Sequence, residues 1–303
     1  MYISKLRLKN WRNFRDASAE DIGDVTYILG ANATGKSNLL DALRFLRDIA
    51  KFRGGGLQEA IQARGGVAKI RCLHARHDPE VSIEVELVSP SGDPLWQYEV
   101  GFTKSKGETH LTKEKVVKFT KDSRPRTVLV RPTSDDEKDP AQLQQSHLEQ
   151  INTNTKFRDL AIFFAGLTYV HLVPQLVKYG DRIGGRTLES DPFGQEFMLR
   201  IAGTQPRSRE ARLRRIEKAL RTIVPQLEDL SFVKDEMTGQ PHLEFKFRHY
   251  RPQGARQRED QFSDGTLRLL SILWLLQEAG DAPLMLEEPE LSLNEQIVRV
   301  QTH

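Results

Sequence analysis

One short stretch near the N-terminus constrains the fold of this chain more than any other part of the sequence. Residues 30–37 read Gly-Ala-Asn-Ala-Thr-Gly-Lys-Ser and match the phosphate-loop pattern G-x-x-x-x-G-K-[ST] at every fixed position. The run 25–29 before it is β-branched and aromatic, and the segment 38–53 after it repeats leucine at helical spacing. A strand, a glycine turn and a helix are therefore predicted, with nucleotide phosphates bound at the turn.

Each residue type in this loop has a physical reason to be there. Glycines let the backbone curl so that successive N–H groups point at an anion, and the helix that follows adds its positive end. Lys36 is predicted to reach the β- and γ-phosphates, and Ser37 to offer its hydroxyl to Mg²⁺. The alternative is a chance glycine turn with an exposed lysine. The cofactor-binding residues expected in and beside the loop are Asn32, Ala33, Thr34, Gly35, Lys36, Ser37 and Asn38.

The composition is that of a soluble globular protein. The 303 residues are 38% hydrophobic and 29% charged, and can form one large domain or two. The longest apolar stretch, 267–276, contains Arg268 and is far shorter than the roughly 20 residues of a membrane span. The first residues lack a signal-peptide pattern, and the lone Cys72 excludes a disulfide framework within one chain. We expect a cytoplasmic protein.

The positive charge is concentrated in one segment. A net charge of +3 permits a polyanionic partner without requiring one. Between residues 207 and 221 the acids are Glu210 and Glu217, against seven basic residues: Arg207, Arg209, Arg212, Arg214, Arg215, Lys218 and Arg221. This pattern is typical of a solvated helix face and also of a contact with nucleic-acid phosphates, and both interpretations stay open.

The first half of the chain after the loop predicts an antiparallel region followed by helices. Strands are expected at 2–8 and, from period-two alternation, at 81–87, 97–103, 113–120 and 126–131. A short helix is expected at 57–63. Next come an acidic loop at 133–140 and two helices within 141–167.

The second half predicts short strands and helices without sustained heptads, which excludes a long coiled coil. The expected elements are a strand at 169–173, a helix from Asp191, the basic helix after Pro206, a hairpin of strands 230–235 and 242–249, and a polar loop at 251–258. His171 lies in the first of these strands and is expected to be a core or surface histidine rather than a catalytic one.

Two further motifs lie near the C-terminus. Ser263 stands where an N-cap belongs, with Gly265 in the first turn, so this helix start is either an ordinary cap or a second anion site. The segment 283–290 is a brief apolar strand that ends in the consecutive carboxylates Glu287 and Glu288. Successive side chains of a strand point to opposite faces. One carboxylate is therefore expected to orient Mg²⁺ or its waters and the next to act as a general base, unless the acids merely cap the strand.

Together the three motifs resemble the head of an ABC-type ATPase of the RecF/SMC class, in the RecF- and OLD-like form without a long coiled coil. Residues 30–37 match its Walker A loop, 263–265 its signature sequence and 284–288 its Walker B motif. The resemblance implies an α/β P-loop NTPase with a mixed central sheet, an antiparallel β-subdomain and a helical lobe. It covers both ends of the chain and leaves 104–230 without a motif.

Two shorter segments extend the resemblance. Residues 10–14, Asn-Trp-Arg-Asn-Phe, are similar to the N-F-R segment of this class, in which an arginine, here Arg12, approaches the nucleotide. Residues 291–294 stand in the position of the D-loop. The glutamine of the family's glutamine loop stays unassigned among Gln58, Gln62 and Gln97.

The resemblance also implies how the sites work. ATP would be held between two copies of the chain, by the Walker A loop of one and by Ser263 and Gly265 of the other. Glu288 would be the hydrolytic base, with Lys36 as the second catalytic residue, and Ser37 and Glu287 would hold Mg²⁺.

Three departures from the family pattern stand out. Glu287 replaces the usual aspartate, which lengthens the metal arm by one methylene, and Asn294 replaces the D-loop aspartate. The chain also ends at His303, only 15 positions after Glu288, which is too short for a helix and a returning strand with a switch histidine. We therefore expect Thr302-His303 not to be that switch, and the C-terminal end of the ATPase core to be missing.

The expected domains are an ATPase core of 1–103 and 230–303, with its antiparallel part reaching to 131, and a helical lobe or lid at 132–229. The expected function is an ATP-binding and ATP-hydrolysing dimer that acts on DNA or an effector in genome maintenance or antiviral defence. The alternative is a nucleotide-gated regulatory module whose partner nuclease carries the chemistry. A transporter ATPase fits the Ser-Asp-Gly signature less well.

Overall fold

The computed structural model describes residues 1–75, 78–105, 107–120, 122–185, 187–248, 255–280, 282–291 and 293. Contacts divide the chain into two compact units, Met1–Leu167 and Thr168–His303, which we call the N-terminal and C-terminal units. The boundary between them falls inside the lobe expected at 132–229, so the division into core and lid stays a prediction.

A six-stranded sheet forms the N-terminal unit. Its order is β2-β1-β3-β4-β5-β6, and each neighbouring pair is antiparallel. The strands are β1 (Tyr2–Trp11), β2 (Phe14–Ala19), β3 (Val81–Val88), β4 (Pro94–Ser105), β5 (Glu108–Phe119) and β6 (Pro125–Arg131). The predicted antiparallel region is therefore confirmed, because apolar side chains give the four inner strands, β1, β3, β4 and β5, a face to bury.

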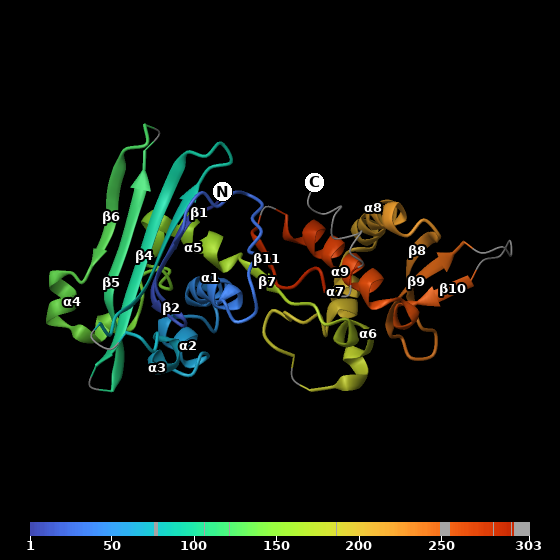
Figure 1. The fold of residues 1–303 in the computed structure, drawn as a ribbon, viewed down its shortest axis with the longest axis horizontal. Helices are drawn as coiled ribbons and strands as arrows, with labels where there is room; N and C mark the ends of the chain where they lie inside the picture. Colours follow the sequence, from blue (N-terminus) through green and yellow to red (C-terminus); the bar gives the residue numbers. More distant parts are fainter. Residues whose placement is uncertain are drawn as a thin grey trace. The chain divides into compact units, whose positions relative to one another are not determined.

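Two helices lie along one face of this sheet (Figure 1). They are α1 (Lys36–Ala50), which follows the phosphate loop, and α5 (Arg158–Ala165). The ring of Phe45 on α1 lies 5.2 Å from that of Phe102 on β4, and the ring of Phe164 on α5 lies 5.6 Å from that of Tyr98, also on β4. Two short helices, α2 (Leu57–Gln62) and α3 (Val67–Ile70), follow α1.

The strand predicted before the phosphate loop is wrong. Residues 25–29 form no strand, and the side chains of Val25 and Leu29 are 69% and 90% exposed. The nearby backbone bonds are local, because Val25 N–H donates to the Asp24 side chain and Gly23 N–H to the Thr26 hydroxyl. An apolar run becomes a strand only when a neighbouring strand pairs with it, and propensity alone does not supply that neighbour.

The segment expected as a loop and then two helices is also different. The expected loop contains α4 (Ser134–Lys138), which starts with a capping box between Thr133 and Asp136. The first expected helix is replaced by two 3₁₀ turns, η1 (Pro140–Gln144) and η2 (Asn154–Phe157), and only the second forms, as α5.

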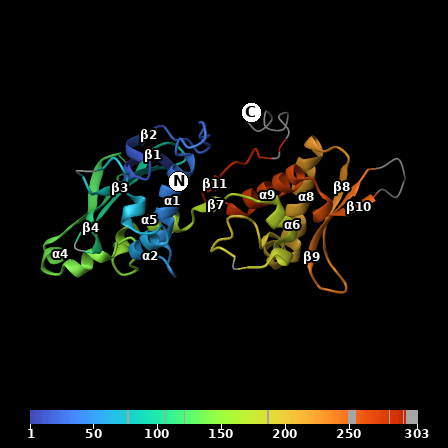
Figure 2. The same cartoon turned by 60° about the horizontal axis from the view of Figure 1, so that its bottom comes forward.

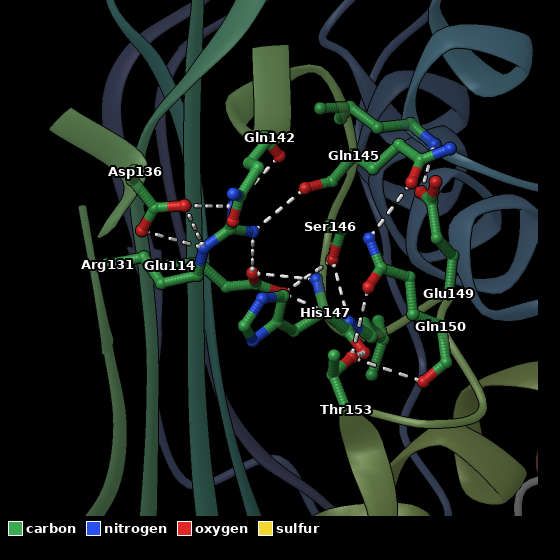
Figure 3. Close-up of polar contacts among 12 residues, drawn as sticks. Glu114, Arg131, Asp136, Gln142, Gln145, Ser146, His147, Glu149, Gln150 and Thr153 are labelled. Atoms are coloured by element: carbon green, nitrogen blue, oxygen red, sulfur yellow. Dashed lines mark hydrogen bonds and ion pairs between the residues drawn. The ribbon is translucent and has the colours of Figure 1, made fainter. Parts of the chain in front are cut away.

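A buried carboxylate explains this irregular segment (Figure 3). Glu114 on β5 is fully buried and accepts hydrogen bonds from the backbone N–H groups of His147 (2.9 Å) and Leu148 (3.1 Å). Arg131, 1% exposed, balances its charge at 3.2 Å and also pairs with Asp136 at 2.6 Å, which lowers the pKa of Asp136 to about 2. These N–H groups donate to the buried carboxylate instead of to helix carbonyl oxygens, because burial of an unpaired carboxylate costs much free energy.

The C-terminal unit holds two small sheets and four helices among its described residues. Strands β7 (Thr168–Val170) and β11 (Leu284–Leu286) pair in parallel, and the order β10-β9-β8 forms an antiparallel sheet. Figure 2 shows α8 beside α9. The remaining elements are β8 (Leu227–Lys234), β9 (Pro241–Phe247), β10 (Ala255–Arg258), α6 (Pro174–Ile183), α7 (Phe197–Gly203), α8 (Pro206–Ile223), η3 (Glu259–Gln261) and α9 (Asp264–Ala279).

The hairpin, the basic helix and the strand before the acid pair are confirmed here. The helix expected from Asp191 begins only at Phe197, because Asp191 accepts the backbone N–H groups of Gln195 and Glu196 and holds a turn. The sequence reading missed α6. The loop expected at 251–258 contains a strand, β10, which pairs with β9. Within the described residues, no helix is both long and apolar enough to cross a membrane.

A half-buried acid in the N-terminal unit makes its stability depend on pH. Burial raises the pKa of Glu149 to about 7, while one of its oxygens accepts the Leu57 N–H at 2.7 Å. Because this folded-state pKa lies above the unfolded value, the contribution of Glu149 to stability is present in full below pH ~4.5 and is lost as the pH rises to about 7. Glu149→Gln keeps an acceptor for Leu57 and should flatten the unfolding free energy over this range. Urea unfolding at several pH values tests this, and parallel curves for the two proteins would contradict it.

Candidate nucleotide site

The phosphate loop is shaped by a close approach of two segments. Gly35 has φ +111° and stands at the N-cap of α1. A Cβ at this position would lie 2.5 Å from Asn13 Nδ2 and 2.7 Å from the ring of Phe14. Only glycine satisfies both the left-handed backbone and the lack of space. The second glycine of the motif is therefore required by the close approach of Asn13 and Phe14, independently of any ligand.

The side chain of Lys36 folds back onto the backbone of the loop. Its Nζ donates to the carbonyl oxygens of Gly30 (2.7 Å) and Ala31 (3.0 Å), and Thr34 Oγ1 also donates to Ala31 O at 2.9 Å. The first turn of α1 holds no acidic residue, and its N-cap makes no side-chain hydrogen bond. A glycine cradle, an ammonium group and a helix N-terminus without an acid suit a phosphate group, so the residues present fit the phosphates of a nucleotide.

Asn13, which sequence reasoning missed, is the residue of the 10–14 turn that contacts the loop. Its Nδ2 donates to Thr34 O at 3.0 Å, and its Oδ1 accepts from Asn38 Nδ2 at 2.9 Å. The buried indole of Trp11 donates to the carbonyl oxygen of Asn38 at 2.8 Å. The turn thus holds both the loop and the first turn of α1. Nothing in the sequence distinguished Asn13 from Arg12, because the choice depends on how the hairpin bends.

Arg12 contacts α1 rather than the loop backbone. Its guanidinium donates to Asp41 at 3.1 Å and to Lys69 O at 3.1 Å. Asp41 also accepts from Arg64 at 3.0 Å, so Arg12 belongs to a cluster of ion pairs. Its approach to the nucleotide stays a prediction, as do the roles of Asn32 and Ala33, which lie exposed in the loop.

The signature helix α9 starts as predicted. The hydroxyl of Ser263 accepts the backbone N–H of Thr266 at 3.2 Å and lies 2.8 Å from the Thr266 hydroxyl. Asp264, the middle residue of the motif, is held from α6 by Lys178 at 2.7 Å and by Gln175 at 2.9 Å. The N-cap is thus confirmed, and binding of an anion by Ser263 and Gly265 stays a prediction.

The two acids at the end of β11 have different partners. Glu287 N–H extends the strand pairing by donating to Val170 O at 2.9 Å, and its carboxylate accepts a hydrogen bond from the Tyr169 hydroxyl. Glu288 Oε2 lies 3.4 Å from His171 Nε2. Both partners come from β7 or the residue after it. The two carboxylates therefore have different surroundings, as their two different expected roles require, and the roles themselves stay predictions.

A buried arginine of α9 holds the backbone of the second acid. Arg268 is 4% exposed, and its Nη1 donates to Glu288 O at 2.8 Å. Glu288 has φ +49°, a conformation that costs energy for a non-glycine residue and persists only where neighbours enforce it. Burial lowers the pKa of Arg268, while Glu288, Glu290 and Asp264 oppose this shift. Arg268 therefore connects the signature helix α9 directly to the backbone of Glu288.

The metal ligands expected are Ser37 in the N-terminal unit and Glu287 in the C-terminal unit. Among the described residues, no cluster of three or more His, Cys, Asp or Glu side chains could hold a metal ion. Mg²⁺ bound to a nucleotide needs only one or two protein oxygens beside the phosphates. The Ser37 hydroxyl and the Glu287 carboxylate are each oxygen donors of this kind, so the chemistry of each fits Mg²⁺, and binding of one ion by both stays a prediction.

Several residues expected at the site lie either outside the described residues or in other contacts of the N-terminal unit. Ser292, Asn294, Thr302 and His303 lie outside the described residues, so the D-loop and switch predictions cannot be placed. Gln58 donates to Thr109 O and Gln144 O, and Gln97 contacts Glu84, so these two glutamine-loop candidates stabilise the N-terminal unit.

The basic residues of helix α8 fall into two groups, according to whether they contact other side chains of the unit. Arg209 stacks at 3.9 Å over Phe232, Arg212 lies 5.3 Å over Trp274, and Arg221 pairs with Glu217 at 2.6 Å. By contrast, three exposed residues form neither an ion pair nor a side-chain hydrogen bond within the described part of the chain: Arg207, Arg214 and Lys218. Arg215 is also exposed and forms no ion pair there, but it donates to the Gln277 side chain at 3.5 Å. Only the second group is available to a polyanion without breaking internal contacts.

The comparisons with known proteins agree with the motifs. The family described as "AAA domain, putative AbiEii toxin, Type IV TA system" matches residues 25–299. The chain belongs to this family. Within it, the chain is an ABC-type ATPase domain of the RecF/SMC class with the α/β P-loop fold, as predicted from the sequence.

Relatives with a curated description match this AAA-domain protein over short stretches. The DNA replication and repair protein RecF of Chlamydia caviae is 49% identical over 61 residues, which are 20% of this chain and 17% of that protein. RecF of Bacillus cytotoxicus is 32% identical over 87 residues, 29% of this chain and 23% of that protein. The matched stretches thus span less than a quarter of these relatives.

Solved structures match over more of the chain but less closely. A structure of the recombination mediator protein RecF of the RecFOR pathway, described as RecF-ATPrS, has a TM-score of 0.41 at 15% identity, over 98% of this chain and 87% of that chain. An Smc head domain from Pyrococcus furiosus has a TM-score of 0.45 at 12% identity, over 97% and 83%.

The contacts of Asn13 generate a direct prediction for nucleotide binding. Asn13→Ala removes the hydrogen bonds to Thr34 O and Asn38, each worth about 1 kcal/mol, so the Kd for ATP should rise about tenfold or more. Titration calorimetry measures it. Arg15→Ala, an exposed change in the next strand, is the control and should leave the Kd within about twofold. An unchanged Kd in a folded Asn13→Ala protein would contradict the role of the turn.

Proposed function

We propose that this chain binds and hydrolyses ATP, dimerises when ATP is bound, and couples dimerisation to DNA or to an effector in genome maintenance or antiviral defence. The observation that supports this most is the loop at the start of α1, where Gly35, Lys36 and an acid-free helix N-terminus form a phosphate cradle. The RecF relatives, whose names specify DNA replication and repair, support the link to DNA.

The proposed reaction uses few protein groups. The N–H groups of the loop and Lys36 bind the phosphates and offset charge that develops on them. Mg²⁺ held by Ser37 and Glu287 would neutralise further phosphate charge. Water attacks the γ-phosphorus, the bond to the bridging oxygen of ADP breaks, and the water proton passes to the carboxylate of Glu288. Ser263 and Gly265 from a second copy of the chain would close the site.

A regulatory module with negligible hydrolysis is the second candidate. It is favoured by the Tyr169 hydroxyl, which donates to one oxygen of the Glu287 carboxylate and so competes with a metal for that oxygen. In that case nucleotide would raise the melting temperature without phosphate release, and a partner such as a nuclease would carry the chemistry.

Loss of Lys36 tests the hydrolytic proposal. Lys36→Ala removes the side-chain cation predicted to reach the β- and γ-phosphates, and ATP turnover with Mg²⁺ should fall to background in a phosphate-release assay. Lys5→Ala, an exposed lysine on β1, is the matched control and should keep full turnover. Equal turnover in the wild type and Lys36→Ala would remove the catalytic claim, and nucleotide-dependent melting without turnover in the wild type would select the regulatory module.

The exposed residues of α8 are the proposed DNA contact. Removing Arg207, Arg214 and Lys218 together should weaken duplex binding and lower the slope of log K against log salt by about three, one for each phosphate contact. Fluorescence anisotropy over a salt series measures both. Removing the exposed Arg126 of β6 together with the exposed Arg124, just before that strand, is the control. A slope unchanged by the α8 substitutions would contradict the proposed DNA surface.

A further inference from the structure

A histidine of the C-terminal unit lies beside the acid proposed as the base. Strands β7 and β11 are parallel with Leu286 opposite Val170, and the pairing continues through Glu287 N–H to Val170 O. The next residue of each segment is then His171 on one side and Glu288 on the other. Their side chains meet, with His171 Nε2 3.4 Å from Glu288 Oε2.

Two contacts, one of the backbone and one of the ring, restrain His171. The backbone N–H of His171 donates to Pro192 O at 2.8 Å, and its ring lies edge-on to Phe193 with the centroids 6.1 Å apart. The side chain of His171 is 28% exposed and that of Glu288 is 45% exposed. The histidine is thus the more fixed member of the pair, and the acid is the member that reaches solvent.

The backbone of Glu288 is fixed independently. Arg268 holds its carbonyl oxygen while φ stays at +49°, so the main chain cannot relax to an extended form that would turn the carboxylate away. A side chain of three torsions on a fixed backbone still has many rotamers, and one further contact is needed to select among them.

We propose that His171 is the positioning residue for Glu288, and this inference rests on the proposed hydrolysis of ATP. With its proton on Nε2, the imidazole donates to Oε2 and selects one rotamer of the acid. The other oxygen, Oε1, accepts the proton of the attacking water. A base held in place works far better than one that samples several orientations, because misplacement by about 1 Å can lower a rate about a hundredfold.

The kinetic test compares three variants by steady-state ATP hydrolysis. His171→Ala should lower kcat roughly ten- to a hundredfold and leave the KM for ATP within about twofold, because the proposed role of His171 is to orient the base and not to bind ATP. His171→Gln places an amide N–H near the position of Nε2 and should restore most of kcat. His242→Ala is the matched control, because it removes another histidine–glutamate contact of this unit, to Glu259 at 2.6 Å, and should leave kcat unchanged.

The Glu288→Gln background separates positioning from a general loss of structure. If His171 acts through Glu288, adding His171→Ala to Glu288→Gln lowers the residual rate no further. The proposal is overturned if His171→Ala retains wild-type kcat, if His171→Gln is as slow as His171→Ala, if His242→Ala is equally slow, or if the two changes are additive.

A spectroscopic test does not depend on turnover. In protein labelled with ¹⁵N-histidine, Glu288→Gln should shift the side-chain resonances that disappear in His171→Gln and leave those of His242 in place. If turnover is insensitive to Lys36→Ala, the proposed function fails, while this shift still reports the His171–Glu288 contact. Unshifted His171 resonances would overturn the contact itself.

Discussion

The phosphate loop depends on one close contact, the approach of Asn13 and Phe14 to Gly35. This contact leaves no room for a side chain at Gly35 and supplies the hydrogen bonds that orient Thr34 and Asn38. The turn that makes it is itself anchored, since Trp11 is fully buried against Phe45 of α1. The hairpin of β1 and β2 therefore serves as a support for the loop, and the loop geometry is set before any ligand binds.

The C-terminal unit applies the same principle to an acid. Glu288 lies just past a strand of three residues, and such a short strand would place a side chain poorly by itself. Arg268 from the signature helix holds its carbonyl oxygen, and His171, the residue after the neighbouring strand β7, approaches its carboxylate. A shift of α9, the helix whose N-cap is proposed to sense ATP on a second copy, would be transmitted to the acid through Arg268.

The sequence predicted the motifs well because each combines local chemistry with local structure. Gly35, Ser263 and the acids after β11 sit where the patterns placed them, and the antiparallel sheet followed from alternation. The errors have non-local causes. A strand at 25–29 needs a neighbouring strand to pair with, and none pairs with it among the described residues. In the segment 141–157, backbone N–H groups bind Glu114 instead of forming a helix. The contact of His171 with Glu288 depends on the pairing of two strands that lie more than a hundred residues apart in the sequence. Periodicity carries no information about such partners.

The central claim is that the phosphate loop of one copy and the signature serine of another bind the same ATP. Light scattering during size-exclusion chromatography of Glu288→Gln, with ATP and Mg²⁺, tests it most directly, because loss of the base should stop hydrolysis without removing a phosphate contact. We expect a dimer that forms only with ATP and that returns to a monomer when Ser263→Arg is added. A monomer at saturating ATP, or a dimer indifferent to nucleotide, would contradict it.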